Sequence, residues 1–158
     1  MKIAVRELPR DRVAYMRYVG PHGPHGIPDL WKRFTEWMTT RGLTGPDAIK
    51  LGIGHDDPDV TPPEKCRYDA CVVVPESFTG DNWVNVTEVP GGKYAIAEFV
   101  GSPDTIRDAW DSLYRTWLPG SGYQPDDRPC LEIYRGTPEA QGRPGAFRCE
   151  LCVPVKPL

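Results

Sequence analysis

The chain has 158 residues, of which 39% are hydrophobic and 26% are charged, and its formal net charge is −3 at pH 7. This length suits a single domain, and the 18 prolines and 16 glycines predict many turns between short elements. Lysine and arginine do not cluster as they would in a protein that neutralises nucleic-acid phosphates, and no apolar run approaches the ~20 residues needed to cross a bilayer. We therefore expect a cytoplasmic protein with no direct nucleic-acid partner and no membrane contact.

The N-terminal segment VRELPRDRVAYMRYVG, residues 5–20, is similar to VTEVPGGKYAIAEFVG, residues 86–101, at a constant offset of 81. Each copy predicts either one bent strand or a tight hairpin, centred on residues 9–12 or 90–93. A helix is predicted next, because apolar residues recur at i, i+3, i+4, i+7 and i+11. They are Ile27, Leu30, Trp31, Phe34 and Met38.

Two strands complete the first half, IKLGIGH at residues 49–55 and RYDACVVVP at residues 67–75. After a polar linker at residues 75–82, the second half repeats the same order of elements, with strands PCLEIYR at residues 129–135 and RCELCVPV at residues 148–155. Its helical stripe has the same spacing and consists of Ile106, Ala109, Trp110, Leu113 and Trp117. Repeat one thus covers residues 1–79 and repeat two covers residues 83–158.

The predicted fold class is α+β, with two strand-helix-strand-strand repeats related by a pseudo-twofold axis and forming antiparallel sheets in one domain, residues 1–158. One repeat alone leaves a sheet face uncovered, so we expect the two copies to pair and bury it jointly. A cleft along the axis is then a natural site for a small organic ligand.

The strand CLEIY predicts what faces this cleft, because side chains alternate along a strand. Leu131 and Ile133 share one face, which we expect to lie under the helix. Glu132 and Tyr134 then look away from the helix, into the space between the halves. At an offset of 80 the first half has glycines instead, and glycine inside a strand often marks close approach by a ligand or another backbone. These glycines are Gly52 and Gly54.

A carboxylate beside aromatic rings suits a lipophilic cation, since the rings add cation–π attraction of about 1–2 kcal/mol where water is excluded. A desolvated Glu132 without a ligand resists ionisation, and a bound cation restores its charge. The alternative interpretation is that Glu132 is a solvated strand residue and that the two glycines mark a bulge.

Several segments resemble the gyrase-inhibitor-like (GyrI-like) family, namely GGKYAIAEFVG, CLEIY, CELCVPV and PDVTPPEKCRYDACVVVP. That family's fold is also the effector-binding domain of AraC-type and multidrug-sensing MerR-type regulators. The resemblance implies that Glu132 binds cationic hydrophobic drugs in a cavity lined by aromatic residues. Those regulators carry a DNA-binding module before this domain, whereas Met1 starts directly on the first strand, so we expect a stand-alone binding protein for amphipathic, cationic or antibiotic-like ligands.

The resemblance also implies two alternatives. Some stand-alone members are hydrolases that open the cyclopropane ring of DNA-alkylating natural products, and in that chemistry Glu132 would activate water while Tyr134 assisted the developing oxyanion. The family name also suggests a modulator of DNA gyrase, so gyrase or a regulator protein is a second class of partner. The same residue types serve plain binding, so they leave open whether the chain is an enzyme.

Further side chains are candidates for the cleft. Tyr68 faces opposite to Asp69 and is a candidate wall residue, Trp110 is a candidate aromatic from the helical stripe, and Trp83 is a candidate lid. Glu150 matches Asp69 in the repeat, and it is either a second acid in the cleft or part of a charge pair at the strand ends.

No metal and no cofactor is expected. His22 and His25 form H-x-x-H, but only Asp29 lies close in sequence as a third ligand. Cys149 and Cys152 are predicted to point to opposite faces of a strand, unlike the cysteines of a redox or zinc motif. The 5 cysteines are odd in number and scattered, so we expect them to be reduced and mostly buried.

Overall fold

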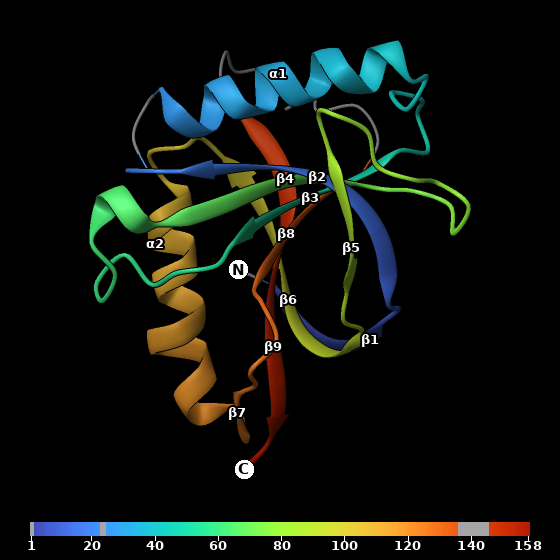
Figure 1. Cartoon of the computed structure of the whole chain (residues 1–158). Helices are drawn as coiled ribbons and strands as arrows, with labels where there is room; N and C mark the ends of the chain where they lie inside the picture. The colour runs from blue at the N-terminus through green and yellow to red at the C-terminus, as the bar shows by residue number, and fades with distance from the viewer. Residues whose placement is uncertain (1, 23–24, 136–145) are drawn as a thin grey trace.

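The computed structural model describes residues 2–22, 25–135 and 146–158 (Figure 1). Within these residues the first half consists of β1 (Ile3–Leu8), β2 (Asp11–Val19), α1 (Gly26–Thr40), β3 (Ile49–Gly54), a 3₁₀ turn η1 (Pro63–Lys65) and β4 (Arg67–Val73). The second half consists of β5 (Asn85–Val89), β6 (Gly92–Gly101), α2 (Ile106–Asp111), η2 (Ser112–Trp117), η3 (Leu118–Gly120), β7 (Tyr123–Pro125), β8 (Leu131–Arg135) and β9 (Phe147–Pro157).

Both predicted helices are present. In α1 the residues Leu30, Phe34 and Met38 of the predicted stripe are buried, together with Trp37. The second helix changes its hydrogen bonding along its length, because α2 continues as the π-helical segment η2 and ends in the 3₁₀ turn η3. This change of helix type is not visible in the apolar spacing of the sequence.

The described strands form one antiparallel sheet in the order β1-β6-β9-β8-β3-β4-β2-β5, and β7 adds to the edge of β9. Exchanging the two halves reverses this order onto itself, so the predicted pseudo-twofold axis passes between β8 and β3. The α+β class with antiparallel, symmetry-related repeats is therefore confirmed. The two sets of strands join at the axis into a single curled sheet.

The open choice between a bent strand and a hairpin is decided by strand pairing. β1 pairs with β6 and β2 pairs with β5, so the two strands on either side of the first bend do not pair with each other. Figure 1 shows the strong curvature of β1 and β2 around this bend. Each half thus gives its first strand to the other half's sheet, which ties the two repeats together.

The two helical segments cover the same face of the sheet. α1 packs on β2 and β4 in a cluster that includes Phe34 and Ala70, and the α2 segment packs on β6 and β9 in a cluster that includes Leu113 and Leu151. The opposite, concave face has its own apolar core. That core contains Val13, Leu51, Ile53, Cys71, Val89, Tyr94, Ile96, Leu131, Ile133 and Cys152.

This arrangement corrects one expectation, because Leu131 and Ile133 lie on the concave face and not under a helix. The central strand β8 is covered on both faces, so a pair of aliphatic residues on this strand does not indicate which face the helices cover. In the described part of the chain, no helix is both long and apolar enough to span a membrane.

Candidate functional site

Glu132 lies at the centre of the fold, on the face that carries the helices. In the pairing of β3 with β8 it stands opposite Gly52, so the pseudo-twofold axis passes through this pair. The Tyr68 hydroxyl donates a hydrogen bond to Glu132 Oε1 at 2.8 Å, and the Tyr134 hydroxyl donates to the same oxygen at 3.3 Å. The prediction that Glu132 and Tyr134 look away from the helix is therefore wrong, although they do lie where the two halves meet.

Tryptophans from both helices complete this arrangement. The Trp31 indole N–H of α1 donates to the Tyr68 hydroxyl at 3.1 Å, and the Trp31 ring lies edge-on to Tyr134 with 5.6 Å between ring centroids. Trp110 of α2 lies close enough to Glu132 to favour the ionised carboxylate, which opposes the effect of burial on the pKa of Glu132. We call these five residues, Trp31, Tyr68, Trp110, Glu132 and Tyr134, the Glu132 cluster.

The two glycines predicted to face Glu132 differ in their surroundings. A Cβ atom at Gly52 would overlap the Tyr68 hydroxyl and the Glu132 carboxylate, so the groups that closely approach this glycine are side chains of the Glu132 cluster and not a ligand. Gly54 lies on the same face two residues later, and a Cβ atom there would meet nothing within 4 Å. Of these two glycines, Gly54 is therefore the one with room for a Cβ atom among the described residues.

Burial dominates the electrostatics of the Glu132 cluster. It raises the pKa of Glu132 above the ordinary glutamate value, while the hydrogen bonds from the two tyrosines and the nearby Trp110 oppose this shift. Burial, followed by the Glu132 charge, raises the pKa values of Tyr68 and Tyr134 as well, so both hydroxyls stay protonated donors. Among the described residues, no cationic side chain lies within 4 Å of the Glu132 carboxylate.

Two of the predicted cleft residues lie elsewhere. Trp83 is 73% exposed, and its backbone N–H donates to Asp81, which also accepts the Trp37 indole N–H from α1. Glu150 lies on the concave face of β9, opposite to Cys149 and Leu151, where it forms a charge pair. The role of Trp83 as a lid over a ligand stays a prediction. Glu150 is separated from Glu132 by the sheet.

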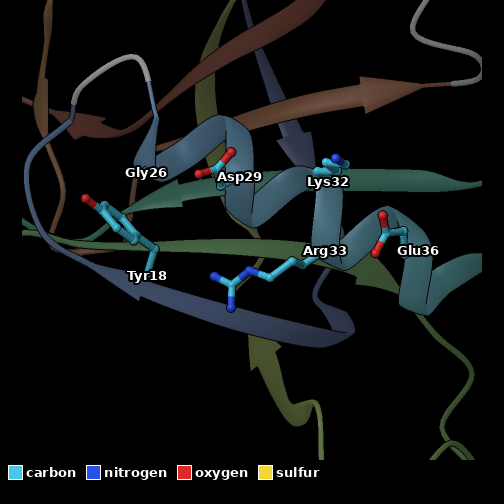
Figure 2. A pocket seen from close by; sticks show the side chains of 6 residues that line it. All are labelled: Tyr18, Gly26, Asp29, Lys32, Arg33 and Glu36. Atoms are coloured by element: carbon cyan, nitrogen blue, oxygen red, sulfur yellow. The ribbon is translucent and has the colours of Figure 1, made fainter.

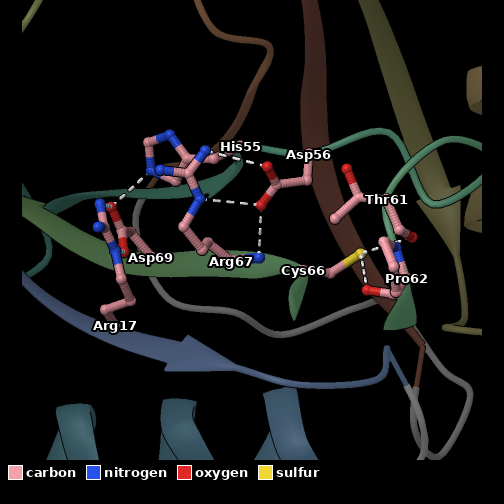
Figure 3. A network of polar contacts seen from close by, with 8 residues as sticks. All are labelled: Arg17, His55, Asp56, Thr61, Pro62, Cys66, Arg67 and Asp69. Atoms are coloured by element: carbon pink, nitrogen blue, oxygen red, sulfur yellow. Dashed lines mark hydrogen bonds and ion pairs between the residues drawn. The ribbon is translucent and has the colours of Figure 1, made fainter. Parts of the chain in front are cut away.

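Glu150 and Asp69 occupy equivalent positions, and one partner of each, Arg135 and His55, is equivalent as well. Glu150 accepts hydrogen bonds from Arg6 at 3.1 Å and Arg135 at 2.8 Å. Asp69 accepts two from Arg17, at 2.8 and 3.0 Å, and lies 2.6 Å from His55 Nε2 (Figure 3).

A charge pair at Asp69 was expected from the neighbouring arginine in the sequence, but its actual partners, Arg17 and His55, were not predicted. A separate pair drawn in Figure 3 is Arg67 and Asp56: the Arg67 side chain donates two 3.0 Å hydrogen bonds to Asp56 and lowers the pKa of Asp56 to about 2. A signal was present in the repeat, because His55 stands where Arg135 stands in the second half at an offset of 80.

Two hollows lie outside the Glu132 cluster. One of about 470 Å³ lies against the polar side of α1, as Figure 2 shows, and it is lined by Tyr18, Gly26, Asp29, Lys32, Arg33 and Glu36. The other, of about 130 Å³, lies on the concave face.

The cysteines follow the expected pattern. All five are free thiols, and four are buried, with Cys130 partly exposed. Cys149 and Cys152 belong to the cores on opposite faces of the sheet, as predicted. Within residues 2–22, 25–135 and 146–158, no group of three or more His, Cys, Asp or Glu side chains is arranged to hold a metal ion. The loop that carries His22 and His25 includes residues 23–24, which lie outside the described residues.

A family model described as the GyrI-like small molecule binding domain matches residues 1–156. The chain belongs to the GyrI-like family. Among curated relatives, it is 38% identical over 114 residues to the SPbeta prophage-derived putative transcriptional regulator YosT of Bacillus subtilis, covering 72% of this chain and 76% of YosT. It is 34% identical over 160 residues to the DNA gyrase inhibitor of Escherichia fergusonii, covering 99% of both chains.

Solved structures share the fold of this GyrI-like chain. EcmrR in its complex with DNA matches with a TM-score of 0.79 and 20% identity, covering 99% of this chain and 58% of EcmrR. SAV2435 bound to tetraphenylphosphonium matches with a TM-score of 0.61 and 17% identity, covering 99% of this chain and 94% of SAV2435. At these identities the likeness concerns the fold alone.

Proposed function

We propose that this GyrI-like protein binds amphipathic organic cations of an antibiotic-like kind at the Glu132 cluster, with Glu132 as the counter-ion. The observation that carries the proposal is a partly buried carboxylate that is surrounded by aromatic side chains from both helices and lacks a cationic partner among the described residues. SAV2435, which shares the fold, was solved with such a cation, tetraphenylphosphonium.

The raised pKa of Glu132 makes the binding of a cation beside it favourable. Burial penalises the ionised carboxylate, and a cation placed beside it removes much of that penalty. The rings of Trp31, Tyr134 and Trp110 add cation–π attraction of about 1–2 kcal/mol in a desolvated site. Both tyrosine hydroxyls already donate to Oε1, so the cation approaches from the side of Gly54, where the space is open.

Calorimetric titration with tetraphenylphosphonium tests this function. Glu132→Gln should weaken binding at least about tenfold, because it keeps the shape but removes the charge. Glu150→Gln is the matched control, since it removes a carboxylate from the opposite face and should leave the affinity unchanged. Equal affinities of the wild type and Glu132→Gln, or an equal loss in both variants, would contradict the proposal.

A hydrolytic function at the same cluster is a second candidate, and the paired Glu132 and Tyr134 groups favour it. A carboxylate with a raised pKa activates water, and a tyrosine that stays protonated donates to a developing oxyanion. Incubation with a cyclopropane-bearing alkylator, followed by mass spectrometry, tests it. Ring-opened product that is lost in Glu132→Gln supports hydrolysis, and binding without product supports the binding function alone.

Inhibition of DNA gyrase is a third candidate, favoured by the 34% identity to a DNA gyrase inhibitor over the whole chain. A supercoiling assay with gyrase and a stoichiometric excess of this protein decides it. Unchanged supercoiling removes this candidate and leaves ligand binding untouched.

A further inference from the structure

The smaller hollow lies on the concave face, on the other side of β3 and β8 from Glu132. Its volume is about 130 Å³, and its floor and walls are mainly apolar. We call it the concave hollow, and it is lined by Leu8, Pro9, Asp11, Ile49, Leu51, Val89, Leu131, Ile133 and Arg135. Two of these nine residues are charged, one of each sign, so the hollow combines an aliphatic interior with an acid and a base.

Asp11 is the acid of the concave hollow. It is partly buried at the start of β2, and burial raises its pKa, an effect that the positive charge of Arg135 opposes. No ion pair within 4 Å joins Asp11 to any of the described residues. A desolvated carboxylate without a close cation favours an ammonium group as its partner.

Arg135 is the base of the concave hollow, at the end of β8. Its Nε–H donates to Glu150 at 2.8 Å. Within the part of the chain that the structure describes, its two terminal nitrogens make no hydrogen bond. A guanidinium with two N–H groups to spare favours a planar carboxylate as its partner.

The volume limits the apolar part of a ligand. A dry protein cavity of about 150 Å³ takes up one benzene molecule, so the concave hollow suits an aliphatic group of that size or smaller. A branched four-carbon side chain fits this limit, whereas a polycyclic cation does not. The walls are aliphatic, and their buried part consists of Leu51, Val89, Leu131 and Ile133.

We propose that the concave hollow binds a free aliphatic amino acid, with its side chain in the hollow, its ammonium group at Asp11 and its carboxylate at Arg135. This site is separate from the Glu132 cluster and takes a different class of ligand, a small zwitterion in place of a large cation. It does not depend on the function proposed for Glu132.

The experiment compares small ligands on the wild-type chain, so that it needs no variant to fold. L-leucine is titrated while methyl resonances are followed by NMR, alongside leucinamide, 4-methylpentanoate and glycine, which lack the carboxylate, the ammonium group and the side chain respectively. L-leucine should shift the methyl signals of Leu131 and Ile133, and each of the other three should bind at least about tenfold more weakly. No shift at millimolar L-leucine, or equal binding of any of the three analogues, overturns the proposal.

Variants then test the two charged residues. Asp11→Asn and Arg135→Gln should each weaken L-leucine binding at least about tenfold, whereas Asp29→Asn, an exposed acid on α1, should not. Unfolding curves establish that each variant is folded. Unchanged L-leucine affinity in folded Asp11→Asn overturns the role of Asp11, and with it the proposal.

Discussion

A methyl group at Gly52 has no room in this fold. The new Cβ atom would overlap both the Tyr68 hydroxyl and the Glu132 carboxylate, so the hydrogen bond between them, now 2.8 Å long, would have to break or move. Overpacking of a tight site costs about 1–3 kcal/mol, and a hydrogen bond to a charged group contributes about 1.5–3 kcal/mol. We therefore expect Gly52→Ala to lower the free energy of unfolding by about 2.5 kcal/mol if both costs are at their lower ends, and by up to about 6 kcal/mol if both are fully incurred.

Gly54→Ala is the matched control. It adds the same methyl group on the same strand and face, where no atom lies within 4 Å, and Gly54 does not have a positive φ. Its unfolding free energy should stay within about 1 kcal/mol of the wild type, because an added Cβ mainly restricts the unfolded chain. Urea unfolding followed by circular dichroism measures both. A Gly52→Ala variant as stable as the wild type, or an equal loss in Gly54→Ala, would refute this account of the Glu132 cluster.

Three further perturbations test the surroundings of the site. Trp31→Phe removes the indole N–H that Tyr68 accepts but keeps an aromatic ring, so the free energy of unfolding should fall by about 0.5–1.5 kcal/mol in urea. Because burial raises the pKa of Glu132, the folded chain keeps that proton to a higher pH than the unfolded chain, and stability falls as the pH rises from the ordinary glutamate value through the raised one. Glu132→Gln should abolish this fall, and unchanged pH dependence would contradict the assignment. For Asp69, burial alone would raise the pKa, but hydrogen bonds from His55 and Arg17 outweigh burial and lower it. The ionised Asp69 therefore stabilises the fold above the ordinary aspartate pKa, and this stabilisation is lost as the pH falls through the lowered pKa. Asp69→Asn should lower the free energy of unfolding by about 1–3 kcal/mol at pH 7, but should not lower it at a pH below both the ordinary and the lowered aspartate pKa. An equal loss at the two pH values would show that the charge of Asp69 is not the cause.

The order of elements was predictable because it rests on local patterns. Strand alternation and helical spacing involve residues only a few positions apart, and the offset of 81 shows that each half uses the same patterns. The bounds of α1 follow this signal closely. The switch from α2 to a π-helical segment does not, since it changes the hydrogen-bond partner of the backbone without changing which side of the helix is apolar.

The face of the sheet to which Glu132 points was not predictable in the same way. Alternation places Glu132 and Tyr134 on one face and Leu131 and Ile133 on the other, but it does not say which face the helices cover. Here both faces of β8 are covered, one by the helices and one by the concave core. An aliphatic pair can therefore lie on either side, and the assumption that it lies under the helix fails.

By itself, the sequence determined the repeat, the equivalence of Glu132 in one half with Gly52 in the other, and which residues of each strand share a face, because these follow from spacing along the chain. The exchange of first strands between halves, the hydrogen bonds from Trp31 through Tyr68 to Glu132, and the separation of Glu150 onto the other face were decided only by the tertiary structure. These contacts join residues that are distant in sequence, so they depend on strand order and register across the whole sheet. Register arises from the joint packing of both faces, which no single segment encodes.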